Sequence, residues 1–281
     1  MHLARPWYND AVMEEGWAHD VEIDRPSSAR MYDYFLGGSH NFAVDRAAAE
    51  QVLAAMPNVR ELAAVNRSFL GRAVRYLLDL GIRQFLDIGS GIPTVGNVHE
   101  IAERADPPAK VVYVDNDPVA VAHSQSLLTG SPHARAIAGD LTHPRAILDN
   151  ADLRATLDFD RPIGLLLMAV LHFIPDAQAY PAVADLVATL PSGSYLGISH
   201  GVATEFRPDQ ADAVSTVSTV YQRSTAGDVP ARVPADVERF FSGLEFVEPG
   251  LVWASKWIGG QPLGEEPERR VGVLGGVARK P

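Results

Sequence analysis

The fold of this chain is decided by the stretch Phe85-Leu86-Asp87-Ile88-Gly89-Ser90-Gly91-Ile92-Pro93-Thr94. A short apolar run ends in an aspartate and breaks into a glycine-rich turn, and a helical pattern follows from about Gly96. Two glycines one residue apart let the backbone turn tightly and approach a ligand, because neither carries a Cβ atom. In an open α/β sheet, nucleotide-like ligands bind beyond the carboxyl end of such a strand. Thr94 stands where a dinucleotide-binding fingerprint has its third glycine, so the turn alone does not identify the ligand.

Two further predicted strands also end near a carboxylate. Residues 111–115 form a β-branched run that ends in Asp115. An aspartate in that place accepts hydrogen bonds from two ribose hydroxyls, in dinucleotide and adenosyl sites alike, or it caps the following helix. The next strand leads into Gly139-Asp140-Leu141. There the carboxylate is placed to accept from an adenine amino group, and its alternative is an ordinary turn aspartate.

In order and spacing, these segments and a fourth apolar run at 164–176 resemble the motifs of class I S-adenosylmethionine-dependent methyltransferases. The stretch Pro26-Ser27-Ser28-Ala29-Arg30-Met31-Tyr32-Asp33-Tyr34-Phe35-Leu36-Gly37-Gly38, followed by 41–46, is similar to the opening of a family of actinobacterial S-adenosylmethionine methyltransferases long catalogued as a domain of unknown function. Residues 65–70 and 250–253 are similar to the same family. The resemblance runs from about Asp24 to the C-terminus. It implies the fold and the cofactor, S-adenosylmethionine, and leaves the methyl acceptor open.

Several side chains are predicted to hold this cofactor. Asp87 either orients the glycine loop or binds the methionine amino group. Arg30 or Arg67 pairs with the methionine carboxylate through a bidentate fork, unless these arginines form salt bridges within a helical cap. The predicted cofactor contacts are Asp87, Gly89, Ser90, Gly91, Asp115, Asn116, Asp140, Leu141, Met168, Ala169, Tyr32 and Arg67.

The N-terminal motif combines aromatic residues with a pair of glycines. Tyr32, Tyr34 and Phe35 precede Gly37-Gly38, a small-residue hinge. Aromatic faces stabilise a cation such as a sulfonium by about 0.5–2 kcal/mol, depending on desolvation. We therefore predict that residues 25–45 act as a lid over the cofactor. The alternative is that the aromatic residues are permanently buried and the glycines only turn the chain.

Two histidines follow predicted strands and are the candidates for acid–base chemistry. His172 follows the fourth strand and His200 ends the fifth, so both are expected near the edge where an acceptor would lie. An imidazole there can take a proton from a hydroxyl acceptor, or it can be an edge histidine satisfied by the backbone. Methyl transfer can also proceed by alignment alone, without a base. The histidines show no H-E-x-x-H or similar spacing, so no metal site is expected.

Composition limits the class of protein. The 281 residues are 47% hydrophobic, enough to bury one large core. No apolar run is long enough to cross a bilayer, and the N-terminus lacks a secretory h-region. The absence of cysteine fits a cytoplasmic enzyme, and the net charge of −11 argues against non-specific nucleic-acid binding. We expect a small-molecule acceptor, no nucleic-acid or membrane partner, and an oligomeric state that the sequence leaves open.

Apolar periodicity predicts two helices, at 47–56 and 61–80, followed by alternating strands and helices. The alternation indicates an α/β fold: a doubly wound, mostly parallel seven-stranded sheet of the class I methyltransferase, Rossmann-like type, with a helical N-terminal cap. Residues 1–24 are expected to form an arm and 25–281 a single domain, with the cap at 25–80 and the α/β core at 81–281. The expected strands are 84–88, 111–115, 134–138, 163–169, 194–200, 244–247 and 271–278, and the later helices 96–105, 118–128, 178–190, 208–223 and 234–242.

The sequence thus predicts an S-adenosylmethionine-dependent methyltransferase that moves a methyl group to an unidentified acceptor by in-line displacement. A nicotinamide-dependent (NAD) oxidoreductase is the less favoured alternative. It would need close helix approach at Thr94 and a catalytic Tyr/Lys pair at short spacing, and no convincing pair is found. A third possibility is a module that binds S-adenosylmethionine as a sensor or scaffold without turnover, since cofactor motifs serve both roles.

Overall fold

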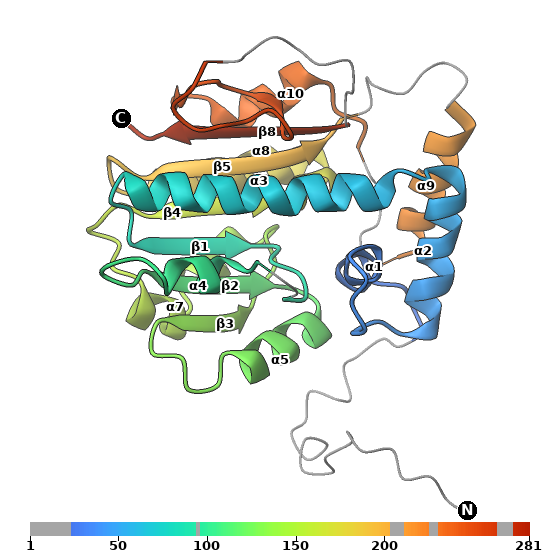
Figure 1. Ribbon diagram of the computed structural model, residues 1–281, viewed down its shortest axis with the longest axis horizontal. Coiled ribbons are helices and arrows are strands. Elements are labelled where there is room, and N and C mark those ends of the chain that lie inside the picture. Colours follow the sequence, from blue (N-terminus) through green and yellow to red (C-terminus); the bar gives the residue numbers. More distant parts are fainter. Residues whose placement is uncertain (1–23, 94–95, 203–210, 225–229, 263–271) are drawn as a thin grey trace, which may run out of the picture.

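The computed structural model describes residues 24–93, 96–202, 211–224, 230–262 and 272–281, and its centre is one sheet (Figure 1). Along the sheet the strands follow the order β3-β2-β1-β4-β5-β8-β6, and β7 pairs with β8 off this path. Most of the predicted arm, residues 1–23, and Thr94 lie outside the described residues. The strands are β1 (Gln84–Ile88), β2 (Lys110–Asp115), β3 (Ala134–Ala138), β4 (Gly164–Met168), β5 (Tyr195–Gly201), β6 (Glu245–Phe246), β7 (Val252–Trp253) and β8 (Val273–Arg279).

Strand pairing confirms the predicted fold class. The pairs β1–β2, β1–β4, β2–β3 and β4–β5 are parallel. The last long strand, β8, runs antiparallel to β5, β6 and β7. All five residues of β1 and of β4 are buried, as expected for central strands covered on both faces. The described residues form an eight-stranded sheet, one strand more than the predicted seven, because the two-residue strand β7 is too short to carry a periodicity.

The helices also follow the expected alternation, with ends shifted by a few residues. Helices α1, α6 and α7 were not predicted from the sequence, and the helix expected at 96–105 spans only the five residues of α4. Two of these missed helices start at local signals, a proline at the first turn of α6 and an Asn150 cap on α7. The helices are α1 (Ser28–Phe35), α2 (Ala43–Ala55), α3 (Val59–Asp79), α4 (Val98–Ala102), α5 (Pro118–Leu127), α6 (Pro144–Leu148), α7 (Ala151–Thr156), α8 (Asp176–Thr189), α9 (Ala211–Gln222) and α10 (Pro234–Glu238), with a 3-10 turn at Arg239–Phe241.

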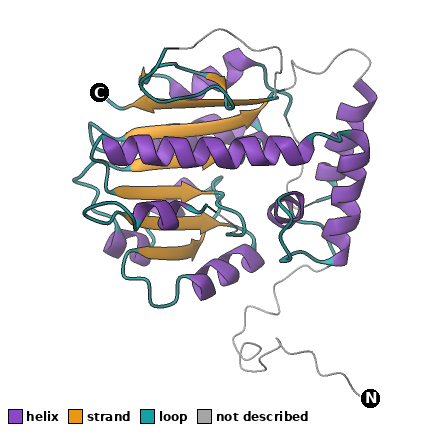
Figure 2. Ribbon diagram, viewed as in Figure 1, coloured by secondary structure: helices purple, strands orange, loops and turns teal. Residues whose placement is uncertain are grey.

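Helices cover both faces of the sheet and bury a core on each (Figure 2). Alternation along β1 sends Leu86 and Ile88 into the core shared with α6, α7 and α8. Phe85 faces the other way, into the core shared with α3 and α4. Asp87 is two residues after Phe85, so its side chain lies on the same face of β1. The carboxylate is therefore on the α3 side, near the end of the strand. This is the first step in building the site.

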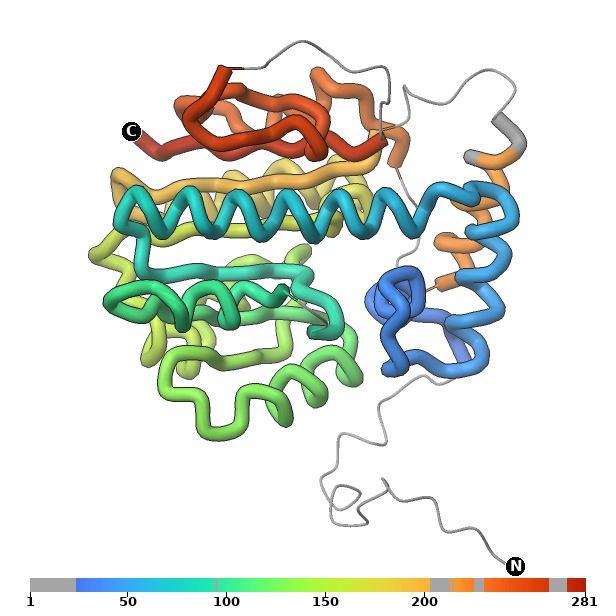
Figure 3. The backbone as a smooth tube through the Cα atoms, viewed as in Figure 1, coloured from blue at the N-terminus to red at the C-terminus, as the bar shows by residue number. Residues whose placement is uncertain are grey.

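A helical cap stands at the carboxyl ends of the parallel strands (Figure 1). It consists of α1, α2, the start of α3 and α9, which pack around a separate apolar cluster that includes Met31, Phe35 and Val220. Segments far apart in the sequence lie side by side here, because α9 packs against α2 (Figure 3). The long helix α3 belongs to both parts: Ala63 lies in the cap cluster and Phe69 in the sheet core. One rigid helix therefore fixes the cap relative to the sheet.

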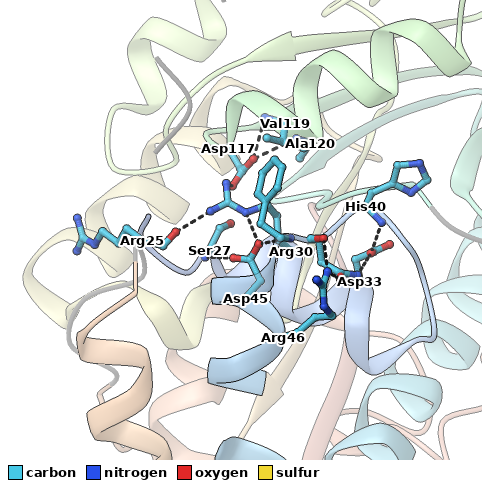
Figure 4. Close-up of polar contacts among 12 residues, drawn as sticks. Arg25, Ser27, Arg30, Asp33, His40, Asp45, Arg46, Asp117, Val119 and Ala120 are labelled. Carbon is cyan, nitrogen blue, oxygen red and sulfur yellow. Dashed lines mark hydrogen bonds and ion pairs between the residues drawn. The ribbon is translucent and has the colours of Figure 1, made fainter. Parts of the chain in front are cut away.

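A buried arginine fastens the cap to the sheet edge (Figure 4). Arg30 of α1 is 2% exposed and donates from Nε to Asp45 Oδ2 at 2.9 Å and from Nη1 to Asp117 Oδ2 at 3.2 Å. Asp117 caps α5 with its other oxygen, which accepts from the N–H groups of Val119 and Ala120. One cation thus joins α1 to α2 and to the first turn of α5, two residues after Asp115. Arg30 is used in this network, one of the two roles considered for it.

Replacing Arg30 by methionine should destabilise the protein by about 3–5 kcal/mol, because Asp45 and Asp117 would keep buried negative charge without the cation that compensates it. Arg46→Met is the matched control. Arg46 is exposed and donates to Asn41, so its loss should cost less than about 1 kcal/mol. Urea unfolding followed by circular dichroism measures both values. Equal effects of the two substitutions would contradict the assigned role of Arg30.

Candidate functional site

The glycine loop after β1 folds over the end of β2. The N–H groups of Gly89 and Ser90 both donate to the carbonyl of Val114, at 2.8 and 3.2 Å. Gly89 and Gly91 have φ of 73° and 64°, a left-handed conformation that favours glycine. A Cβ atom on Gly89 would overlap the side chain of Val170, whereas one on Gly91 would meet open space. Gly89 is therefore required for packing, and Gly91 leaves room for a ligand.

Asp115 is held in a fixed orientation at the end of β2. Its Oδ2 accepts from the N–H of Gly91 at 2.7 Å and its Oδ1 from the N–H of Asp117 at 2.9 Å. Burial raises the pKa of Asp115 to about 6, against these backbone hydrogen bonds, which lower it. Each oxygen keeps a lone pair for a further donor, so the carboxylate is placed to receive a pair of hydroxyls.

Asp87 is a buried acid that faces the same space. Among the residues that the structure describes, none donates a hydrogen bond to its carboxylate, although only 4% of the residue is exposed. Burial raises the pKa of Asp87 to about 7, while the nearby cation of Arg67 lowers it and Asp115 raises it further. No loop N–H is bonded to this carboxylate, so it does not orient the glycine loop through a hydrogen bond; its binding of an amino group stays a prediction.

These groups open into one cavity of about 360 Å³ that continues beneath the cap. Asp87 and Asp115 line its sheet side. Residues of α1, α2, α3 and α9 line the cap side, and the loop after β4 and the segment before α10 also contribute. All predicted cofactor contacts except Asp140 and Leu141 border this cavity: Tyr32, Arg67, Asp87, Gly89, Ser90, Gly91, Asp115, Asn116, Met168 and Ala169.

The two remaining contacts stand just beyond β3, outside the cavity wall. Asp140 accepts from the N–H of Thr142 at 2.8 Å, the bond of a turn aspartate, and its side chain is 44% exposed. Leu141 is buried in the core shared with α6 and α7. Their contact with an adenine ring stays a prediction.

The two candidate histidines differ in their surroundings. His200 is fully buried, its Nδ1 contacts the carbonyl of Gly201, and its Nε2 accepts from Arg232 at 3.1 Å. Burial and the Arg232 cation lower the pKa of His200 to about 4. His172 lines the cavity, and its ring lies 5.4 Å from that of His200. Of the two histidines, His172 is placed to contact a bound molecule, whereas His200 does not line the cavity.

Comparison with known proteins identifies the family. The family model described as S-adenosyl methyltransferase matches residues 14–281. A protein of the DUF574 family from Streptomyces avermitilis MA-4680 is 40% identical, with a TM-score of 0.82, and the match covers 92% of this chain and 99% of that one. A putative methyltransferase from Thermobifida fusca YX is 36% identical, with a TM-score of 0.83 and coverage of 92% and 96%.

The chain belongs to the S-adenosyl methyltransferase family. This confirms the predicted family, fold and cofactor, and it leaves the oxidoreductase alternative without support. No curated protein matches the chain, so no relative of that kind supplies an acceptor. Among the described residues, no helix is long and apolar enough to span a membrane.

The site fits the cofactor of an S-adenosyl methyltransferase. The Asp87 carboxylate lacks a donor within the described residues and suits the methionine ammonium group, and Arg67 nearby suits its carboxylate. Arg67 donates from Nη2 to Asn97 Oδ1 at 2.9 Å, which holds its guanidinium in place. Gly91 offers the close approach that the adenosyl group needs.

A polar chain beside the cofactor edge was not predicted. Ala169 has φ of 55°, an uncommon conformation for a residue with a Cβ atom. Its N–H donates to Ser199 Oγ at 2.9 Å, and that hydroxyl donates to Asn66 Oδ1. Asn66 Nδ2 in turn donates to the hydroxyl of Tyr32 at 2.8 Å. The chain thus connects the end of β4 to α1 of the cap. The only sequence signal was Asn66 within the family-like stretch 65–70.

Whether residues 25–45 move as a lid stays a prediction. Within this segment Met31 and Phe35 belong to the buried cap cluster, and Tyr34 donates its hydroxyl hydrogen to Glu50 on the outside. Tyr32 is the tyrosine of the segment that lines the cavity, and its hydroxyl donates to the carbonyl of Ala63 at 3.1 Å.

Gly91→Val should abolish measurable binding of S-adenosylhomocysteine, because the new side chain would project into the cavity. Gly130→Val is the matched control: Gly130 also has a positive φ, of 83°, and a Cβ there meets open space on the surface. Both variants carry the same backbone strain of about 1–2 kcal/mol. Isothermal calorimetry should find normal affinity only in the control. Normal affinity of the Gly91 variant would place the cofactor elsewhere.

Binding of S-adenosylhomocysteine should weaken as the pH falls below 7, since an ionised Asp87 is needed to pair with the ammonium group. We expect the affinity to fall about tenfold per pH unit there, and Asp87→Asn to bind weakly with a shallower profile between pH 6 and 8, where Asp115 still titrates. In the absence of ligand, lower pH has the opposite effect through Asp87: it stabilises the folded protein. The folded state holds a proton that the unfolded state releases, so the free energy of unfolding rises as the pH falls from 7 towards 4. An affinity of the native protein that is independent of pH from 8 to 6 would contradict this role.

Proposed function

We propose that this methyltransferase acts on a small molecule that occupies the cap side of the cavity. The observation that supports the proposal is the continuity of the space: a single cavity joins Asp87 and Gly91 to the apolar residues of the cap helices. The absence of cysteine from the sequence supports a cytoplasmic location.

We further propose the role of each residue on the cofactor side. Asp115 accepts from the ribose hydroxyls, and the loop at Gly91 lies against the adenosyl group. Asp87 pairs with the ammonium group and Arg67 with the carboxylate of the methionine portion. Asp140 and Leu141, beyond β3, border the adenine. Together these residues support one orientation of the bound cofactor, with its methionine portion near α3 and its ribose near β2.

When bound, S-adenosylmethionine supplies an electrophilic methyl group on a sulfonium. The chain's own contribution is alignment and exclusion of water, which together account for much of the acceleration of such displacements. Tyr32 and Asn66 connect the cap to the strand end at Ala169, so they fix the distance between the acceptor wall and the cofactor edge. We propose that residues 25–281 work as one methyltransferase domain for this reason.

Asp115→Ala should weaken the binding of S-adenosylhomocysteine by about 1–3 kcal/mol, because the ribose hydroxyls would lose their acceptor. Asp160→Ala removes an exposed aspartate from a turn outside the cavity and is the control. Calorimetric titration of both variants at pH 8 gives the comparison, with circular dichroism to verify folding. Unchanged affinity in a folded Asp115 variant would remove the assignment of β2 as the ribose strand.

A further inference from the structure

The cap side of the cavity is apolar. Phe35 comes from α1, Val59 and Leu62 from α3, Val217 from α9, and Phe173 from the loop after β4. The acidic residues among the described lining are Asp87 and Asp115, and both belong to the cofactor side. A cationic acceptor would therefore find no carboxylate where it has to bind, and a sugar-like acceptor would bury most of its hydroxyl groups against carbon, since few polar side chains such as Ser28 and Ser218 line this side.

A buried cation borders the same space. Arg232 lines the cavity and is 2% exposed. Its guanidinium donates to the carbonyls of Leu171 and Ile174, at 2.6 and 2.7 Å. Its only carboxylate partner among the described residues is Asp176, whose side chain is 56% exposed. Water screens that carboxylate more than it screens the buried guanidinium, so the wall near His172 is positive.

His172 is the polar side chain next to this cation. Its Nδ1 is buried and has no hydrogen-bond partner among the described residues, so Nε2 is the ring nitrogen that is left for a ligand. Burial, His200 and Arg232 all lower the pKa of His172, and the imidazole is therefore neutral at physiological pH. A neutral imidazole accepts a hydrogen bond from a hydroxyl. The same positive wall that opposes imidazolium formation stabilises negative charge on an acceptor oxygen, which favours an acidic hydroxyl.

We propose that the methyl acceptor is a hydrophobic aromatic molecule that is methylated on a phenolic oxygen, with its hydroxyl directed to His172. This rests on the proposed function and specifies its acceptor. In the transfer, the phenolic oxygen forms a bond to the methyl carbon and the carbon–sulfur bond breaks. Its electron pair stays on sulfur, which becomes a neutral thioether, and the hydroxyl proton is released to water while neutral His172 orients the oxygen. Atoms and charge balance without any further reactant.

The test uses the full-length protein with three ligands that share a ten-carbon bicyclic ring system and with two larger phenols. The probes are naphthol, hydroxyanthracene and hydroxyflavone as phenols, naphthylmethylamine as a cation, and decahydronaphthol as a saturated alcohol. Calorimetry with S-adenosylhomocysteine comes first, because failure there would overturn the proposed function itself. With S-adenosylhomocysteine bound, the phenols should bind at least about tenfold more tightly than the amine and the saturated alcohol. With S-adenosylmethionine, mass spectrometry should find the methyl ether.

Two substitutions in α3 locate the binding. Leu62→Gln places an amide in the apolar wall and should weaken phenol binding about tenfold, while S-adenosylhomocysteine binds as before. Ala64→Gln puts the same residue on the exposed side of that helix and should change neither affinity. If Leu62→Gln does not fold, the comparison of phenols with the amine in the native protein still decides. If the cofactor product binds but none of the phenols does, or if the amine is preferred, the acceptor class is wrong and the proposed function stands.

Discussion

The bonds of Asp117 unite the parts of the site. One of its carboxylate oxygens caps α5, the other receives the buried Arg30 of the cap, and its own N–H donates to Asp115. The cap, the helix after β2 and the Asp115 carboxylate are therefore connected through a single residue. Burying the Arg30 guanidinium costs solvation free energy. Its contribution is therefore to fix one geometry of the cap over the strand ends.

Buried charge also makes the candidate site less stable than an ordinary apolar core. Asp87 and Asp115 both lie buried under the cap, and burial raises their pKa values to about 7 and about 6. A carboxylate with no donor lowers stability in the free protein and gives affinity when a cation arrives. The left-handed Ala169 is a second such feature, held by Ser199. Both lie at the cavity, as expected for strain that serves binding.

The sequence predicted the sheet better than the cap. Buried parallel strands leave continuous apolar runs that end in glycine or acid, so β1, β2 and β4 could be located from local pattern. The cap is formed by α1, α2 and α9, whose partners lie far apart along the chain, and no local pattern reports such packing. The role of Arg30 was open for that reason, since Asp117 is 87 residues away. His172 and His200 looked equivalent in sequence, and only tertiary contacts with Arg232 separate them.

The central claim is that one cavity holds the cofactor at the strand ends and the acceptor beneath the cap. A crystal structure with S-adenosylhomocysteine tests it most directly. In that structure the amino nitrogen should lie about 2.8 Å from an Asp87 oxygen, the ribose hydroxyls should contact Asp115, and the sulfur should face the apolar side of the cavity. A thioether bound with its sulfur turned away from the cap, or an amino group bonded to residues other than Asp87, would contradict it.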